Sequence, residues 1–134
     1  MKAEARACPC ARTSEGCGLI YCAALRLPPG GSLLPLPQAC AVPRRRFRGR
    51  CDLNTYFTLL GLVEDGRRDL AEAMLQNTAH QTDNLGHVPN GNRGYLLSRS
   101  QPPFFHRVVA RVCAVPAAEA FASYLSQTRR EHAF

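Results

Sequence analysis

The segment from Gly86 to Pro103 holds the residues of this 134-residue chain whose types and spacing best suit specific chemistry. Amide, guanidinium and hydroxyl side chains stand there among glycines and prolines, which stiffen the backbone. Amide and guanidinium groups suit ligands with paired donors and acceptors, and long ordered loops often have a function. We expect Asn92 and Arg93 to hold the shape of this loop. The candidate binding residues in it are Asn90, Arg99, Ser100 and Gln101.

Groups for acid–base or nucleophilic catalysis are poorly placed. Several carboxylates, from Glu64 to Glu72, surround an expected helix start, where acidic residues commonly assist capping. The other carboxylates form no pair with motif context, and the four histidines are better interpreted as structural or exposed. The sequence therefore predicts no catalytic residue in this chain.

The seven cysteines do not predict a metal site or a cofactor. Four of them lie in the first 22 residues, but their spacing lacks the C-x2-C pairs of a zinc ribbon and no histidine is near. We interpret Cys40, Cys51 and Cys113 as ordinary thiols.

The elements that must position the loop are helices. Residues 1–31 show no usable periodicity and read as an irregular, unassigned segment, and prolines keep residues 32–51 irregular as well. Apolar spacing then predicts helices over about 53–64, 67–84, 104–112 and 116–128, with Gly86 ending the second. No stretch alternates long enough to predict a strand. The expected class is all-α, built of antiparallel helix pairs.

Charge and hydropathy limit the alternatives. The net charge is +7, and sixteen of the seventeen basic residues are arginine, with one dense cluster between Arg44 and Arg50. A nucleic-acid adaptor could use such a cluster, but GC-rich coding bias explains the composition equally simply, and we expect no nucleic-acid partner. No apolar run is long enough to span a membrane. The N-terminus makes a poor secretory signal, so the default expectation is a cytoplasmic chain.

The loop G-H-V-P-N-G-N-R-G-Y-L-L-S-R-S-Q-P-P-F-F, from Gly86 to Phe105, closely resembles the second signature of the trehalases. The segment T-Y-F-T-L-L-G-L, starting at Thr55, is similar to the helix that precedes it in that family. The resemblance covers about residues 32–134. It implies that the chain is a truncated N-terminal part of an (α/α)6 barrel. Members of that family are inverting glycoside hydrolases, which split α,α-trehalose into two glucose molecules.

The resemblance also implies which residues contact the sugar. Positions matching Asn90 and Arg99-Ser100-Gln101 bind substrate in trehalases, as does the arginine matching Arg46. Asn54 stands where the family has the aspartate of a sugar-contacting Trp-Asp pair. Amide and guanidinium groups match the vicinal hydroxyls of a neutral disaccharide, so trehalose or a related sugar is the expected ligand.

Departures from the family argue against activity in this chain alone. Its first signature is changed, with Leu53-Asn54 for Trp-Asp and Gly49 for an acidic residue. The family's catalytic acid and base lie downstream of the region present, and inversion requires both. A decayed or frame-damaged gene would explain this pattern.

The missing helices should leave apolar faces uncovered, with Phe104, Phe105, Val108 and Val109 as the examples. The alternative is a non-catalytic helical fragment that binds carbohydrate or associates with a chain supplying the rest of the barrel. An intact parent could be periplasmic.

Overall fold

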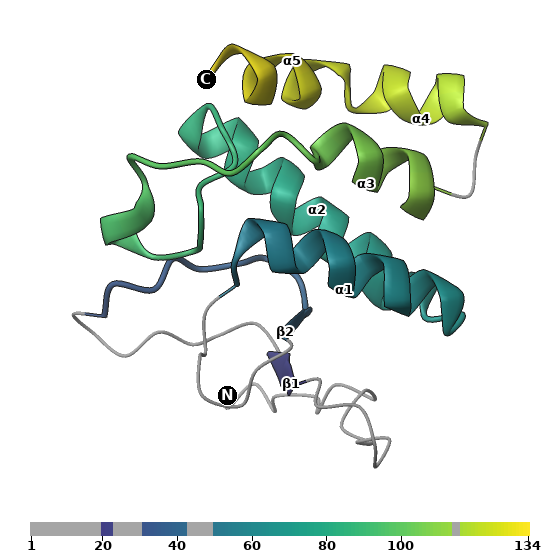
Figure 1. The fold of residues 1–134 in the computed structure, drawn as a ribbon, viewed down its shortest axis with the longest axis horizontal. Helices are drawn as coiled ribbons and strands as arrows, with labels where there is room; N and C mark the ends of the chain where they lie inside the picture. The colour runs from purple at the N-terminus through teal and green to yellow at the C-terminus, as the bar shows by residue number, and fades with distance from the viewer. Residues whose placement is uncertain (1–19, 23–30, 43–49, 114–115) are drawn as a thin grey trace, which may run out of the picture.

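The computed structural model describes residues 20–22, 31–42, 50–113 and 116–134. This part of the chain is mostly helical, with five α-helices, one short 3-10 turn and a small β-ribbon. The helices are α1 (Asp52–Glu64), α2 (Arg68–Leu85), α3 (Phe105–Val112), α4 (Ala117–Ser123) and α5 (Leu125–Ala133), and the 3-10 turn is Gly94–Leu96. Figure 1 shows α1 and α3 in front of α2, with α4 and α5 along one edge.

The bounds of the first three helices agree with the predicted ranges within one or two residues. Two glycines explain the sharp ends. Gly66 has φ 72° in the turn between α1 and α2, and Gly86 has φ 82° just after α2, a region that favours glycine. Arg67 N donates to the Leu62 carbonyl at 2.8 Å, which closes the first turn.

The absence of strands was a wrong prediction. The strands β1 (Ile20–Cys22) and β2 (Cys40–Val42) form a two-stranded antiparallel ribbon, with Ile20 opposite Val42. β2 is buried because it packs against α1 and α2, and Ala41 N lies 3.4 Å from Met74 Sδ. Three-residue strands are too short for an alternating pattern to reveal them.

The last predicted helix is broken in two. Tyr124, with φ −115° and ψ 17°, separates α4 from α5. The break leaves Ala120 buried but Leu125 44% exposed, so the predicted single apolar stripe does not continue across it.

The core lies between α1, α2 and α3. Its largest fully buried side chains include Leu59, Met74 and Val109, one from each helix. The predicted uncovered face of α3 is wrong for Phe105, Val108 and Val109, which are at most 5% exposed. Only Phe104 of the named group stays partly exposed. The chain therefore buries most of the apolar face of α3, which was expected to be uncovered.

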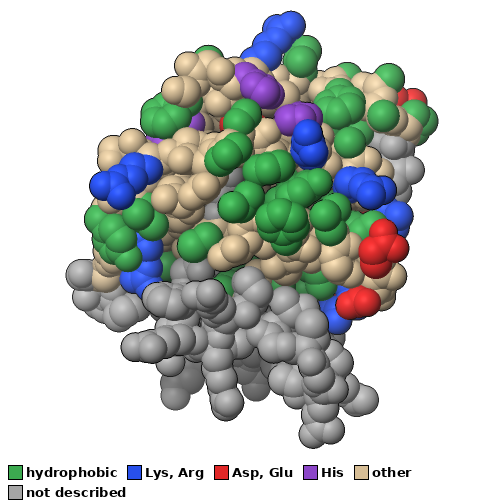
Figure 2. Space-filling model, in the orientation of Figure 1, with side chains coloured by type: hydrophobic (Ala, Val, Ile, Leu, Met, Phe, Trp, Pro, Cys, Tyr) green, Lys and Arg blue, Asp and Glu red, His purple; other side chains and the backbone are tan. Residues whose placement is uncertain are grey.

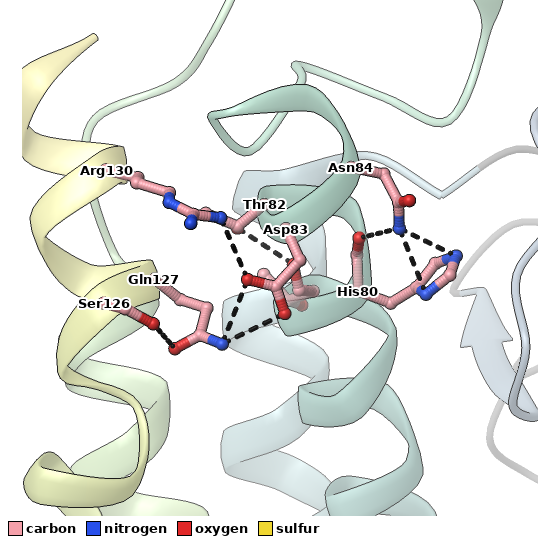
Figure 3. Close-up of polar contacts among 8 residues, drawn as sticks. His80, Thr82, Asp83, Asn84, Ser126, Gln127 and Arg130 are labelled. Atoms are coloured by element: carbon pink, nitrogen blue, oxygen red, sulfur yellow. Dashed lines mark hydrogen bonds and ion pairs between the residues drawn. The ribbon is translucent and has the colours of Figure 1, made fainter.

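Helix α5 is held against the other helices by polar contacts. Asp83 near the end of α2 accepts hydrogen bonds from Gln127 Nε2 (3.0 and 3.2 Å) and Arg130 Nη1 (3.1 Å), as Figure 3 shows. The buried carboxylate of Glu131 accepts from Phe105 N at 3.2 and 3.3 Å. Glu131 therefore caps the start of α3, where the helix dipole favours a negative charge.

Candidate functional site

The predicted binding loop connects α2 to α3 and is closed by bonds between its own two arms. Asn90 N donates to the Arg99 carbonyl at 2.7 Å. Ser100 Oγ donates to the Val88 carbonyl at 2.8 Å, and His87 Nε2 donates to the Leu97 carbonyl at 2.8 Å. Residues on both sides of the 3-10 turn are therefore held at fixed separations, although the loop has almost no regular secondary structure.

The loop is also fixed to the start of α1 through Gly91. Gly91 forms an isolated antiparallel bridge with Cys51. A Cβ atom at Gly91 would lie 2.9 Å from the Arg50 carbonyl oxygen and 2.9 Å from Leu96 Cδ1. Such distances do not occur for real Cβ atoms, so this close approach of two backbones requires glycine.

Asn92, 1% exposed, joins three segments of the chain. Its Oδ1 accepts from Arg50 N at 2.7 Å, and its own backbone N donates to the Arg50 carbonyl at 3.1 Å. Its carbonyl accepts from Leu34 N at 2.8 Å. Beside it, Arg93 Nη1 donates to Ser32 Oγ at 3.3 Å. Both residues hold the shape of the loop, as predicted.

The structure brings together the four candidate binding residues of the loop. Gln101 Nε2 donates to Asn90 Oδ1 at 2.6 Å, which orients both amides. Asn90 Nδ2 and Gln101 Oε1 make no hydrogen bond within the part of the chain that the structure describes. Arg99 is exposed and adjoins this pair through its backbone bond to Asn90. One donor, one acceptor and a guanidinium are thus free to meet a ligand.

The hydroxyl of Ser100 is engaged within the loop itself. Its hydroxyl hydrogen points to the Val88 carbonyl and also lies 3.2 Å from the Gln101 carbonyl. Its remaining contribution to a ligand would be as an acceptor.

The two candidate binding residues outside the loop are Asn54 and Arg46. Asn54 is exposed on the first turn of α1, three positions after the Cys51–Gly91 bridge that joins this helix to the loop. Arg46 lies outside the described residues. The structure thus places Asn54 on the element next to the loop and leaves Arg46 a prediction.

A buried arginine beneath the loop was missed by the sequence analysis. Arg50, 4% exposed, donates from Nε to Thr55 Oγ1 (2.9 Å) and from Nη1 to Gln81 Oε1 (2.7 Å). Its Nη2 donates to Thr78 Oγ1. The signal was present: Thr55, Thr78 and Gln81 are polar residues on otherwise apolar helix faces. Such residues need a buried partner. Because it is buried, Arg50 is not available to bind phosphate.

Two histidines lie together at the junction of α3 and α5. The ring centres of His106 and His132 are 5.5 Å apart. Burial lowers the pKa of His106 below its usual 6.5, and the neighbouring His132 and Arg107 lower it further. Contact with the Pro103 backbone acts in the opposite direction and raises the pKa in part. The neutral form of His106 is therefore favoured.

The carboxylates nearest the helix ends are engaged in packing. Asp83 bonds Gln127 and Arg130, and Glu131 caps α3, as described above. Among the described residues, no three side chains of the His, Cys, Asp and Glu types gather as metal ligands would. No helix in this part of the chain is long and apolar enough to cross a membrane.

Comparisons with known proteins find matches over most of the chain. The trehalase family model matches residues 22–134. A periplasmic trehalase of Escherichia coli O1:K1 / APEC is 48% identical over 103 residues, which are 77% of this chain but 18% of that protein. A periplasmic trehalase of Xanthomonas oryzae pv. oryzae (strain MAFF 311018) is 46% identical over 108 residues, 81% of this chain and 19% of that protein.

The chain belongs to the trehalase family. It spans about a fifth of the length of the curated relatives that it matches.

Proposed function

We propose that this chain is an N-terminal part of a trehalase-type (α/α)6 barrel that keeps part of a disaccharide-binding loop and does not hydrolyse trehalose alone. The single observation that carries this proposal is the closed loop in which Asn90, Arg99 and Gln101 lie together. The amides and the guanidinium offer the donors and acceptors that sugar hydroxyls need. The relatives' name indicates the substrate of the parent, α,α-trehalose.

The lack of hydrolysis is proposed from the carboxylates. An inverting glycosidase places two carboxyl groups about 6.5–9.5 Å apart, on either side of the scissile bond. In the described part of the chain, Asp83 and Glu131 are held in contacts between helices. The changed first signature, with Leu53-Asn54 in place of Trp-Asp, supports the same proposal and is consistent with a decayed gene.

The test is glucose release from α,α-trehalose by the purified 134-residue chain, with circular dichroism on the same sample. We expect a helical spectrum and no glucose above a buffer blank. Turnover that disappears in Arg99→Ala would overturn the proposal, because it would mean that carboxylates of this chain, or of an assembled partner, supply the acid and the base.

A second candidate is a non-catalytic fragment that binds carbohydrate through the preformed loop. The unpaired Nδ2 of Asn90 and Oε1 of Gln101 favour it. NMR or calorimetric titration with trehalose would detect such binding, with Asn90→Ala as the variant and Gln76→Ala, exposed on α2, as the control. Binding that is equal in both variants would exclude this loop as the site.

The compartment follows from the relatives only as a proposal. Those proteins are named periplasmic trehalases, and we propose the periplasm for an intact parent of this chain. The alternative compartment is the cytoplasm. Cell fractionation with an antibody to the chain would decide between the two compartments.

A further inference from the structure

The small β-ribbon places two cysteines directly opposite each other. Cys22 of β1 is the antiparallel register partner of Cys40 of β2. In such a pair the Cα atoms of opposite residues are about 4.5–5.5 Å apart, and both residues belong to the same face of the ribbon. The Cα atoms of disulfide-bonded cysteines are usually about 4.4–6.8 Å apart. The backbone register therefore suits a disulfide between Cys22 and Cys40 without any change of strand pairing.

The position of Cys40 is fixed by the core. Cys40 is 2% exposed, and β2 packs against α1 and α2. On one side of it, Ala41 N donates to Met74 Sδ at 3.4 Å. On the other side, Asn77 of α2 accepts from Gln38 N at 2.9 Å and donates to the Gln38 carbonyl at 3.0 Å. The backbone is thus held to α2 both before and after Cys40.

The position of Cys22 depends on the ribbon itself. Among the described elements, β1 packs mainly against β2, and Figure 1 shows it on the side of β2 away from the helices. A ribbon of two three-residue strands is marginally stable by itself. A covalent bond from Cys22 to Cys40 would join β1 to a strand that the core already holds.

The other described cysteines have no such partner. Cys51 is exposed, and its isolated bridge pairs it with Gly91. Cys113 follows α3, and burial together with the nearby Glu72 raises the pKa of its thiol, which disfavours the reactive thiolate. The register of β1 and β2 therefore selects one pair among the cysteines that the structure describes.

We propose that Cys22 and Cys40 form a redox-sensitive disulfide that fastens β1 to the core. The oxidant is a small disulfide such as oxidised glutathione. The thiolate of one cysteine attacks it, which gives a mixed disulfide and releases one thiol. The thiolate of the second cysteine then displaces the other half as a second thiol. The protein has lost two electrons and two protons, and the oxidant has gained them.

Two conditions of this exchange follow from the molecule. Cys40 is buried, so the exchange takes place during folding, before β2 is packed. The periplasm proposed for an intact parent is an oxidising compartment in which disulfides persist, whereas the cytoplasm keeps thiols reduced. The state of the pair should therefore follow the compartment, although bond formation itself does not depend on sugar binding or hydrolysis.

The experiment refolds the 134-residue chain from urea in a mixture of oxidised and reduced glutathione. Figure 2 shows hydrophobic side chains gathered at the centre of one face, over α1, and exposed apolar groups can bring copies together. The chain is therefore refolded at low concentration, and gel filtration selects the monomer. Remaining thiols are blocked by alkylation, and the protein is digested with trypsin without reduction. Mass spectrometry of the peptides then locates any disulfide.

We expect a species that links peptide 13–26 to peptide 27–44, with the bond between Cys22 and Cys40. Cys17 lies in the same peptide as Cys22, so Cys17→Ser is the matched control and should keep the linked species. Cys22→Ser should lose it. In urea unfolding, the oxidised chain should have a higher midpoint than the reduced chain, because a cross-link restricts the unfolded state. This difference should persist in Cys17→Ser and disappear in Cys22→Ser.

Three results would overturn the proposal: no linked species from the unmodified sequence, a bond from Cys40 to a cysteine other than Cys22, or a midpoint difference that survives in Cys22→Ser. The peptide map of the unmodified sequence does not depend on how well any variant folds. None of these measurements uses glucose release, so turnover by the isolated chain would contradict the proposed function and leave the disulfide standing.

Discussion

At the scale of single residues, the loop depends on one buried amide more than on the residues that face a ligand. Asn92 accepts the Arg50 amide hydrogen and binds Leu34 through its carbonyl. Asn90 and Gln101 hold each other by one bond and keep other atoms free. The residues that shape the site and those that would bind a ligand are thus separate, and substitutions should separate their effects.

Asn92→Ala should destabilise the chain by about 1–3 kcal/mol, because it leaves the buried Arg50 amide without its acceptor. Urea unfolding followed by circular dichroism measures this loss. Asn90→Ala is the control. It removes only a half-buried bond and should cost under about 1 kcal/mol. Equal losses for the two variants would show that the Arg50 contact does not organise the loop.

The His106–His132 pair predicts a pH dependence of stability. The pKa of His106 is lowered in the folded chain, so the unfolded chain binds more protons as the pH falls through 6.5. The free energy of unfolding should therefore be highest above that pH and decrease as the pH falls toward the lowered value. His106→Asn should reduce this slope, measured by urea unfolding at a series of pH values. Gln76→Asn, at an exposed residue of α2 that does not titrate, is the control and should leave the slope unchanged; an equal reduction would contradict the assignment.

At the scale of elements, local signals predicted most helix boundaries. Gly66 and Gly86 stand at the ends of α1 and α2 because their positive φ angles suit glycine, and this preference is visible in sequence. The break at Tyr124 has no such signal, since neither glycine nor proline is present there. Local pattern alone could not predict it.

Long-range contacts explain what else was missed. Arg50 reaches Thr78 and Gln81, which are 28 and 31 residues away, so no spacing rule links them. β1 and β2 likewise pair across a long separation. The candidate binding residues Asn90, Arg99 and Gln101 could be proposed from the sequence because they share one loop. Their arrangement depends on Asn92 and Gly91, whose partners lie in another segment.

The contact between α5 and α3 yields a prediction about capping. Glu131→Gln keeps an acceptor oxygen for Phe105 N but removes the charge that favours the start of α3. We expect a loss of about 0.5–1 kcal/mol in the free energy of unfolding. Glu64→Gln, at an exposed residue ending α1, should change stability by less than about 0.5 kcal/mol. A thermal melt of both variants checks this, and similar shifts would argue against a cap.

At the scale of the whole molecule, the chain has a core of its own together with an uncovered helix face. Leu59, Met74 and Val109 meet in the interior, while Phe57 stands 59% exposed. A fragment of a barrel was expected to leave its apolar faces open. Here that holds for one side of α1 and not for the packed side of α3. The isolated chain should therefore fold as a unit.

Unfolding of the isolated chain tests that expectation directly. We expect one cooperative urea transition by circular dichroism, because the buried side chains of three helices share one core. Val109→Ala should lower the midpoint, with a loss of about 2 kcal/mol, since Val109 is fully buried and its truncation leaves a cavity. Phe57→Ala should cost under about 1 kcal/mol because its ring is mostly in solvent. If the transition is broad and Val109→Ala does not move it, the helices form without fixed packing.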